Sequence, residues 1–130
     1  MEKQRITHPD RAEDFSTGAY SDGLVCGDLL FVSGQTPIDF KTKTYQLGTI
    51  EEETRQTLDN IKAILEAAGC TLDNVMKSTV HLADSNDFGR FNEVYASYFS
   101  GVRPARTTVQ SGLQNGIKVE IDVIAKLPRS

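Results

Sequence analysis

Apolar residues recur at helical spacing between Thr49 and Gly69, with charged and polar residues at the intervening positions. The apolar positions are Leu58, Ile61, Ile64, Leu65 and Ala68. Thr49 and Glu52 fit a capping box, and Gly69 stands where helices favour a residue with positive φ. The pattern predicts an amphipathic helix with both ends marked.

A second stripe of apolar and aromatic residues predicts another amphipathic helix, ending at Ser100-Gly101. Its members are Phe88, Phe91, Val94, Tyr95, Tyr98 and Phe99. The preceding run Asp84-Ser85-Asn86-Asp87 supplies several candidate N-caps.

The remaining apolar stretches predict strands, because they are short and rich in β-branched residues. Residues 24–33 read as a hairpin with a turn at Gly27-Asp28, and Ser33-Gly34 ends its second strand and opens a loop. Further strands are expected at 75–82, 106–110 and 117–127. The last two are joined across Gln114-Asn115-Gly116, whose Asn-Gly pair favours a turn with positive φ.

This order predicts an α+β fold in which two helices pack on one face of a mixed β-sheet. The other face then needs a different cover. In the last strand Val119, Ile121, Val123 and Ala125 share one face, but Ile124 lies outside that set. We therefore expect the uncovered face to meet another subunit.

Composition indicates an ordinary globular chain. With 130 residues, of which 38% are apolar, one domain spanning 1–130 is expected. The net charge of −4 and the scattered basic residues disfavour nucleic-acid binding. Neither a membrane span nor a signal peptide is evident, so a cytoplasmic protein is expected. Cys26 and Cys70 are expected to be unpaired core residues.

Familiar catalytic and cofactor motifs are missing from the sequence. His8 and His81 are its two histidines, too few for a multi-histidine metal site, and no metal is expected. Since His81 falls within a predicted strand, a structural or surface role is its simpler interpretation.

Arg106 and Glu120 place opposite charges in two predicted strands. A guanidinium can clamp a carboxylate with two parallel hydrogen bonds, and a partly desolvated carboxylate can move a proton. The alternative is a structural ion pair, because the two residues flank the Asn-Gly turn and would meet across a hairpin.

Several segments, in order, resemble the reactive intermediate deaminase family, also called Rid or YjgF. The matching segments are 18–21, 30–37, 54–61, 78–80 with 86–88, 92–95, 104–109 and 119–121. The resemblance implies a fold like trimeric chorismate mutase, with clefts between subunits. It also implies hydrolysis of enamines and imines, such as 2-aminoacrylate, 2-iminopropanoate and 2-iminobutanoate, to 2-oxo acids and ammonia, without a bound cofactor.

The resemblance also implies roles for individual residues. Arg106 matches the arginine that holds the substrate carboxylate, and Glu120 matches the acid beside the attacking water. The further substrate-binding positions are Tyr20, Ser33, Gly34, Asn92 and Thr108. Each has a plainer interpretation: Tyr20 as a core residue, Ser33-Gly34 as a turn, and Asn92 as a helix amide that needs partners.

Two departures from the family pattern lie beside Tyr20. Ala19 replaces the usual proline, so the loop that aims the tyrosine loses a fixed φ, and Asp22 stands where glutamine or glutamate is common. The resemblance leaves two other functions open: a ligand-binding or chaperone-like trimer without turnover, and a deaminase for a larger enamine such as an aminomuconate intermediate. Ribonuclease activity, suggested for some relatives, gains little support from an acidic chain.

Overall fold

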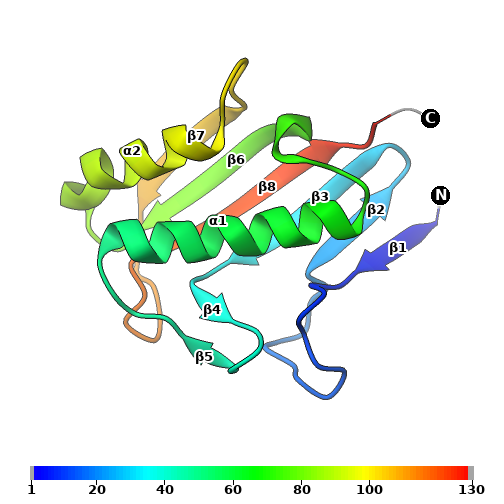
Figure 1. Ribbon diagram of the computed structural model, residues 1–130, viewed down its shortest axis with the longest axis horizontal. Helices are drawn as coiled ribbons and strands as arrows, with labels where there is room; N and C mark the ends of the chain where they lie inside the picture. Colours follow the sequence, from blue (N-terminus) through cyan, green and yellow to red (C-terminus); the bar gives the residue numbers. More distant parts are fainter. Residues whose placement is uncertain (1, 129–130) are drawn as a thin grey trace.

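The computed structural model describes residues 2–128, and its elements follow the predicted order of strands, helix, strand, helix and strands (Figure 1). The strands are β1 (Lys3–Ile6), β2 (Gly23–Cys26), β3 (Leu29–Gln35), β4 (Ile38–Asp39), β5 (Thr44–Tyr45), β6 (Val75–Leu82), β7 (Ala105–Gln110) and β8 (Val119–Lys126). The helices are α1 (Ile50–Ala67) and α2 (Phe88–Tyr98), with 3-10 turns η1 (Leu72–Asn74) and η2 (Ser85–Asp87).

Six strands form one mixed sheet in the order β1-β2-β3-β8-β6-β7. β6 and β7 run parallel, and the other neighbours run antiparallel. The predicted hairpin between 106–110 and 117–127 is therefore wrong, because β6 lies between β7 and β8. Asn115 and Gly116 do adopt the expected positive φ, at 62° and 74°, but within a loop that carries the chain past β6.

The first helix has the predicted ends. Thr49 Oγ1 accepts the N–H of Glu52 at 3.2 Å, Glu52 Oε1 accepts the N–H of Thr49 at 3.0 Å, and Gly69 has φ 81°. Its apolar face is buried against β3 and β8. The buried carboxylate of Glu53 accepts the Lys118 N–H at 2.7 Å and the Lys118 ammonium at 3.0 Å, which anchors α1 to the chain entering β8.

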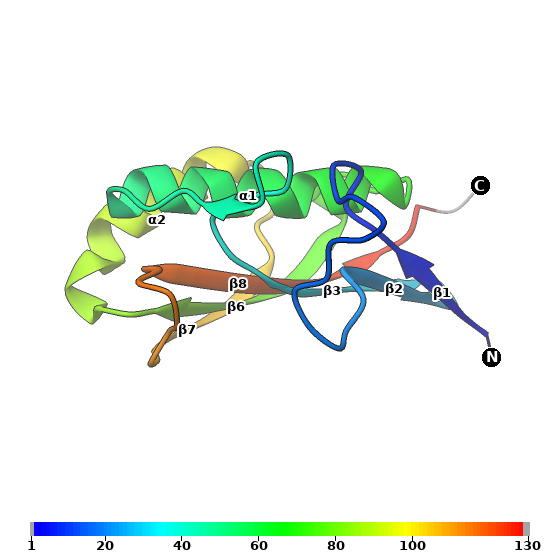
Figure 2. The same ribbon diagram turned by 90° about the horizontal axis from the view of Figure 1, so that it is seen from below.

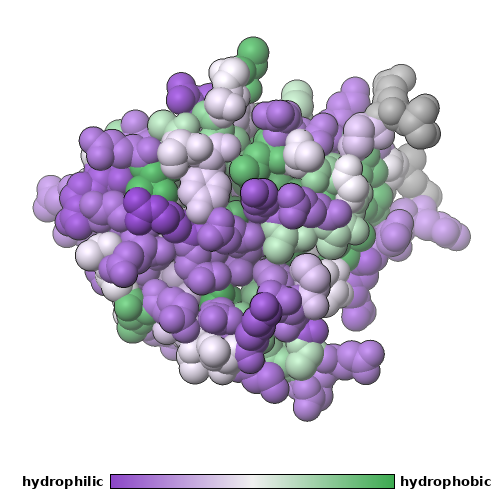
Figure 3. Space-filling view, viewed as in Figure 1, coloured by the Kyte–Doolittle hydropathy of each residue, from purple (hydrophilic) through white to green (hydrophobic). Residues whose placement is uncertain are grey.

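Both helices lie on one side of the sheet, and its other side carries no helix among the described residues; only the loop between β1 and β2 reaches over that side (Figure 2). The residues of β8 that face the helices are buried: Val119, Ile121, Val123 and Ala125. Ile124 points the other way, beside Phe31 of β3, whose side chain is 40% exposed. The helix-bearing side is largely hydrophilic along α1 (Figure 3). In β3 the exposed Leu29 and Phe31 alternate with the buried Leu30 and Val32, so these exposed apolar side chains lie on the open face.

Ser33-Gly34 does not end its strand, as the sequence suggested, but forms a β-bulge within β3. Val32 pairs with Val123 and Gln35 with Ile121, so β3 has one more residue than β8 over this interval. A bulge bends its strand. This one lies beside the start of β8, where Gln35 pairs with Ile121, the residue directly after Glu120.

Candidate functional site

A cleft of about 630 Å³ opens at the end of the sheet where β3 and β6 finish and β8 begins. Four of the expected site residues line it: Tyr20, Ser33, Gly34 and Glu120. They come from the loop before β2, the bulge of β3 and the open face of β8. The structure thus brings together side chains that are far apart in the sequence.

Glu120 lies against the backbone of Gly34. A Cβ at Gly34 would lie 3.1 Å from Glu120 Cδ and nearer still to Oε2, so only glycine allows this approach. Among residues 2–128 no donor hydrogen-bonds the Glu120 carboxylate. The adjacent Ser33 hydroxyl donates to the carbonyl of Ser21 at 2.6 Å, which ties the bulge to the Tyr20 loop.

Tyr20 is not a core residue, because 52% of it is exposed. Its hydroxyl lies 2.6 Å from Thr17 Oγ1. The ring covers Gly18, where a Cβ would come within 2.7 Å of Tyr20 Cε1. The phenol is therefore held at the mouth of the cleft by its own loop.

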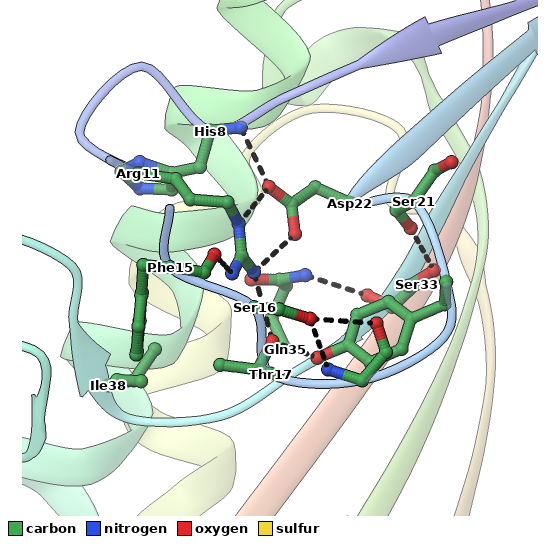
Figure 4. A network of polar contacts seen from close by, with 12 residues as sticks. His8, Arg11, Phe15, Ser16, Thr17, Ser21, Asp22, Ser33, Gln35 and Ile38 are labelled. Carbon is green, nitrogen blue, oxygen red and sulfur yellow. Dashed lines mark hydrogen bonds and ion pairs between the residues drawn. The ribbon is translucent and has the colours of Figure 1, made fainter. Parts of the chain in front are cut away.

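An ion pair between Arg11 and Asp22 organises this loop (Figure 4). Arg11 Nε donates to Asp22 Oδ2 at 2.9 Å, and Nη2 donates to Oδ1 at 2.7 Å. The guanidinium also donates to the Phe15 carbonyl and, at 3.1 Å, to Thr17 Oγ1, the partner of Tyr20. The hydrogen bonds to Asp22 raise the pKa of Arg11. Asp22 is thus the buried anchor of the loop.

Arg106 and Asn92 form a second group, on the other side of the sheet. Arg106 Nη1 donates to Asn92 Oδ1 at 2.8 Å, and its guanidinium carbon lies 4.7 Å from the centre of the Tyr95 ring. Tyr95 OH and Ser78 Oγ are 2.6 Å apart, and burial raises the pKa of Tyr95. A smaller pocket of about 300 Å³ adjoins Arg106 and Asn92.

Thr108 lies two residues beyond Arg106 on β7, on the same face. Its hydroxyl is buried and has no hydrogen-bond partner among residues 2–128. The core hydroxyls of Thr54 and Thr57 also have no partner within these residues, so the unpaired hydroxyl does not by itself mark Thr108 as a site residue.

The structural ion pair between Arg106 and Glu120 is wrong for a single chain. Arg106 pairs with Ser78 on β6, and Glu120 pairs with His81. Because Ser78 and His81 are an odd number of residues apart on a regular strand, they face opposite sides of the sheet. Arg106 therefore faces the helices and Glu120 faces the open side.

His81 and Ser111 line the same cleft as Glu120, although the sequence suggested no site role for either residue. His81 Nδ1 lies 2.9 Å from Ser111 Oγ. The alternation of residues on its strand places His81 on the open face, but only the strand order shows that Glu120 is its neighbour.

Within the described residues, no group of three or more His, Cys, Asp or Glu side chains is placed to hold a metal ion. Neither helix of this part of the chain has the length and apolar character needed to cross a membrane.

Comparison with known proteins places the chain in a family. The family model described as endoribonuclease L-PSP matches residues 12–127. A RutC family protein from Pyrococcus horikoshii is 51% identical over 109 residues, covering 83% of this chain and 86% of that protein. A 2-iminobutanoate/2-iminopropanoate deaminase from Rattus norvegicus is 45% identical over 109 residues, covering 83% and 80% respectively.

Solved structures agree with this assignment. The crystal structure of a protein of unknown function from the conserved Rid family of Yersinia pestis superposes with a TM-score of 0.90. It is 38% identical, and the match covers 97% of this chain and all of that one. The chain therefore belongs to the endoribonuclease L-PSP family, the Rid or YjgF family that its sequence motifs resemble.

Proposed function

We propose that this protein hydrolyses small 2-imino and 2-enamino acids, such as 2-aminoacrylate, 2-iminopropanoate and 2-iminobutanoate, to 2-oxo acids and ammonia. The observation that carries the proposal is the Glu120 carboxylate, which lies in the cleft against Gly34 without a hydrogen-bond donor from residues 2–128. A carboxylate so placed can accept a proton from water. The rat relative named for this activity supports the same assignment.

The complete site, in this proposal, is shared by two copies of the chain in a homotrimer. One copy contributes Arg106, Asn92 and Thr108, and its neighbour contributes the cleft with Tyr20, Ser33, Gly34 and Glu120. The opposite faces of Arg106 and Glu120 support this arrangement, because one chain cannot bring them to one ligand. The exposed apolar residues of the open sheet face supply an interface.

Arg106 binds the substrate carboxylate. A guanidinium has five N–H donors, and Asn92 engages one of them, on Nη1. The edge formed by Nε and Nη2 is left for a bidentate contact, while the Tyr95 ring supports the guanidinium plane.

Glu120 then acts as the base. It accepts a proton as water attacks the imine carbon, and the tetrahedral intermediate releases ammonia as the carbonyl forms. Ser33 and the backbone of Gly34 shape the wall beside the attacking water, and Tyr20 closes the mouth of the cleft. This chemistry requires neither a metal nor a bound cofactor.

The test generates 2-aminoacrylate in situ with a serine or threonine dehydratase and follows 2-oxo acid formation with and without this protein. Faster formation supports the deaminase. Unchanged rates with 2-aminoacrylate and with 2-iminobutanoate leave the ligand-binding trimer as the better assignment. If the rate increases only with a longer enamine, such as an aminomuconate intermediate, the protein is still a deaminase but its substrates are larger than proposed.

A further inference from the structure

His81 occupies a position beside Glu120 that the proposed reaction does not yet use. The two residues are direct partners across the antiparallel strands β6 and β8, and both line the cleft. Direct cross-strand partners have Cβ atoms about 4.5–5.5 Å apart. One small ligand can therefore contact the imidazole and the carboxylate at the same time.

The imidazole is held by one nitrogen only. Its Nδ1 lies 2.9 Å from Ser111 Oγ, and the Ser111 N–H donates to the Leu82 carbonyl at 2.9 Å, which fixes the serine against β6. No protein atom among residues 2–128 forms a hydrogen bond with Nε2. The second nitrogen is thus available to a ligand in the cleft.

The charges around His81 come from several elements. Glu120 lies on the open face of β8, directly beside His81. Asp122, two residues further along β8, lies on the same face. The partner on β7 is the apolar Val109. Arg11 and Tyr20 also line the cleft, but the Arg11 charge is paired with Asp22. The charged side chains that share the open face with the imidazole on β8 are therefore carboxylates.

We propose that His81 is the catalytic acid that protonates the substrate nitrogen, while Glu120 takes the proton from water. This assignment rests on the proposed deaminase function. As the water oxygen bonds to the imine carbon, the C=N π pair moves to nitrogen, Glu120 takes a water proton and His81 gives its proton to nitrogen. The product of this step is a neutral carbinolamine.

The second step restores both groups. Glu120 returns its proton to the amine nitrogen, the C–N bond breaks with its electron pair on nitrogen, and ammonia leaves. The carbonyl forms as the hydroxyl proton passes to His81. The sum is imine plus water giving 2-oxo acid plus ammonia, with the carboxylate and the imidazolium regenerated.

The variant His81→Asn tests this role, because its amide can keep the hydrogen bond to Ser111 but cannot donate a titrating proton. We expect kcat to fall about a hundredfold to ten-thousandfold with little change in KM, as general acid catalysis predicts. The fall of activity toward alkaline pH, caused by loss of the His81 proton, should disappear from the kcat profile. The matched control is Thr79→Val, a substitution two residues before His81 on the same face of β6. This variant should keep the wild-type dependence of kcat on pH, including the fall of activity toward alkaline pH.

Chemical rescue provides a second readout that a structural role would not move. Imidazole added to His81→Ala should raise its rate in proportion to the imidazolium concentration, and should leave Glu120→Gln unchanged. Wild-type kcat with the alkaline limb intact in His81→Asn, or no rescue of a folded His81→Ala, would overturn the role of His81 alone. Absence of turnover by the wild-type protein would instead overturn the deaminase function on which that role depends.

Discussion

Arg106 and Glu120 lie on opposite faces of the same sheet, separated by strand β6. Arg106 is directed toward α2, where it contacts Asn92, and Glu120 is directed into the cleft on the open side. A ligand of three or four carbons cannot bridge the two groups through the sheet. If both act on one substrate, they must come from different copies of the chain.

This arrangement predicts complementation between two inactive variants. Arg106→Ala and Glu120→Gln should each lose turnover. In mixed trimers assembled from equal amounts, about one quarter of the sites should combine an intact Arg106 with an intact Glu120 and recover activity. Coupled turnover of the co-refolded mixture measures this fraction. Mixing Arg106→Ala with the double variant provides the control, since no subunit then has an intact Arg106 and no site is restored. If the first mixture also recovers no activity, Arg106 and Glu120 do not act together on one substrate.

Substitutions that preserve charge or shape separate binding from proton transfer. Arg106→Lys keeps the charge but loses the bidentate geometry, so kcat/KM should fall tenfold to a thousandfold, about 1.4 to 4 kcal/mol, with little change in melting temperature. Glu120→Gln should still bind a 2-oxo acid product, while turnover drops about a hundredfold or more. Product affinity and the rate of 2-aminoacrylate hydrolysis distinguish the two. A Glu120→Gln protein with full turnover would refute the role of Glu120 as base.

The helices were predictable because their signals are local. The capping box of Thr49 and Glu52, the spacing of the α1 apolar residues and the positive φ of Gly69 all act within a few residues. β1 gave no such signal, since Lys3, Gln4 and Arg5 are exposed and only Ile6 of this edge strand is buried. An edge strand without an apolar face cannot be told from a loop by its pattern.

The site was only partly predictable because it depends on strand order. The Asn115-Gly116 signal correctly predicted positive φ, but a turn residue does not reveal whether the strands beside it pair or admit a third between them. The order β8-β6-β7 sets Arg106 apart from Glu120 and brings His81 beside Glu120. Likewise, the Arg11–Asp22 pair joins two ends of one loop, and sequence spacing alone did not indicate it.

The ion pair between Arg11 and Asp22 predicts a role for Asp22 in stability and in the Tyr20 loop. Asp22→Asn leaves a largely buried guanidinium without its counter-charge and should cost about 3 to 5 kcal/mol of unfolding free energy. KM should rise as the Thr17 and Tyr20 hydroxyls lose their fixed support. Denaturant unfolding and steady-state kinetics measure the two effects.

Asp28 provides the control for Asp22. Its contact with Lys126, at 4.0 Å, is exposed, so Asp28→Asn should change stability by less than about 1 kcal/mol. Equal losses in the two variants would contradict the special role of the Asp22 pair.

The open sheet face predicts a trimer that a buried charge would break. The wild-type protein should sediment at about three times 14.3 kDa. Phe31→Asp places a carboxylate among the exposed apolar residues of this face and should shift the protein toward the monomer and abolish turnover. Lys62→Gln, on the exposed side of α1, changes the net charge by the same amount and should remain trimeric. Sedimentation of a stable, active Phe31→Asp trimer would exclude this face as the interface.

His8 predicts a component of stability that is lost in mild acid. Its Nδ1 accepts the N–H of Asp10 at 3.1 Å, so Nε2 carries the proton and donates to Asn60 Oδ1 at 3.2 Å, which requires the neutral ring. Burial lowers the pKa of His8 from its ordinary value of 6.5. Between the lowered pKa and 6.5 the unfolded chain therefore binds more protons than the folded one, and stability falls as pH drops below 6.5. His8→Gln keeps a donor toward Asn60 but does not titrate, and it should cost about 1 to 3 kcal/mol at pH 7.5 through lost packing against Phe40. The difference in unfolding free energy between the two proteins should be smaller at pH 5.5 than at pH 7.5, because only the wild type loses stability when His8 binds a proton on unfolding.

An equal difference at both pH values would contradict this prediction, since it would mean that His8 binds no additional proton on unfolding.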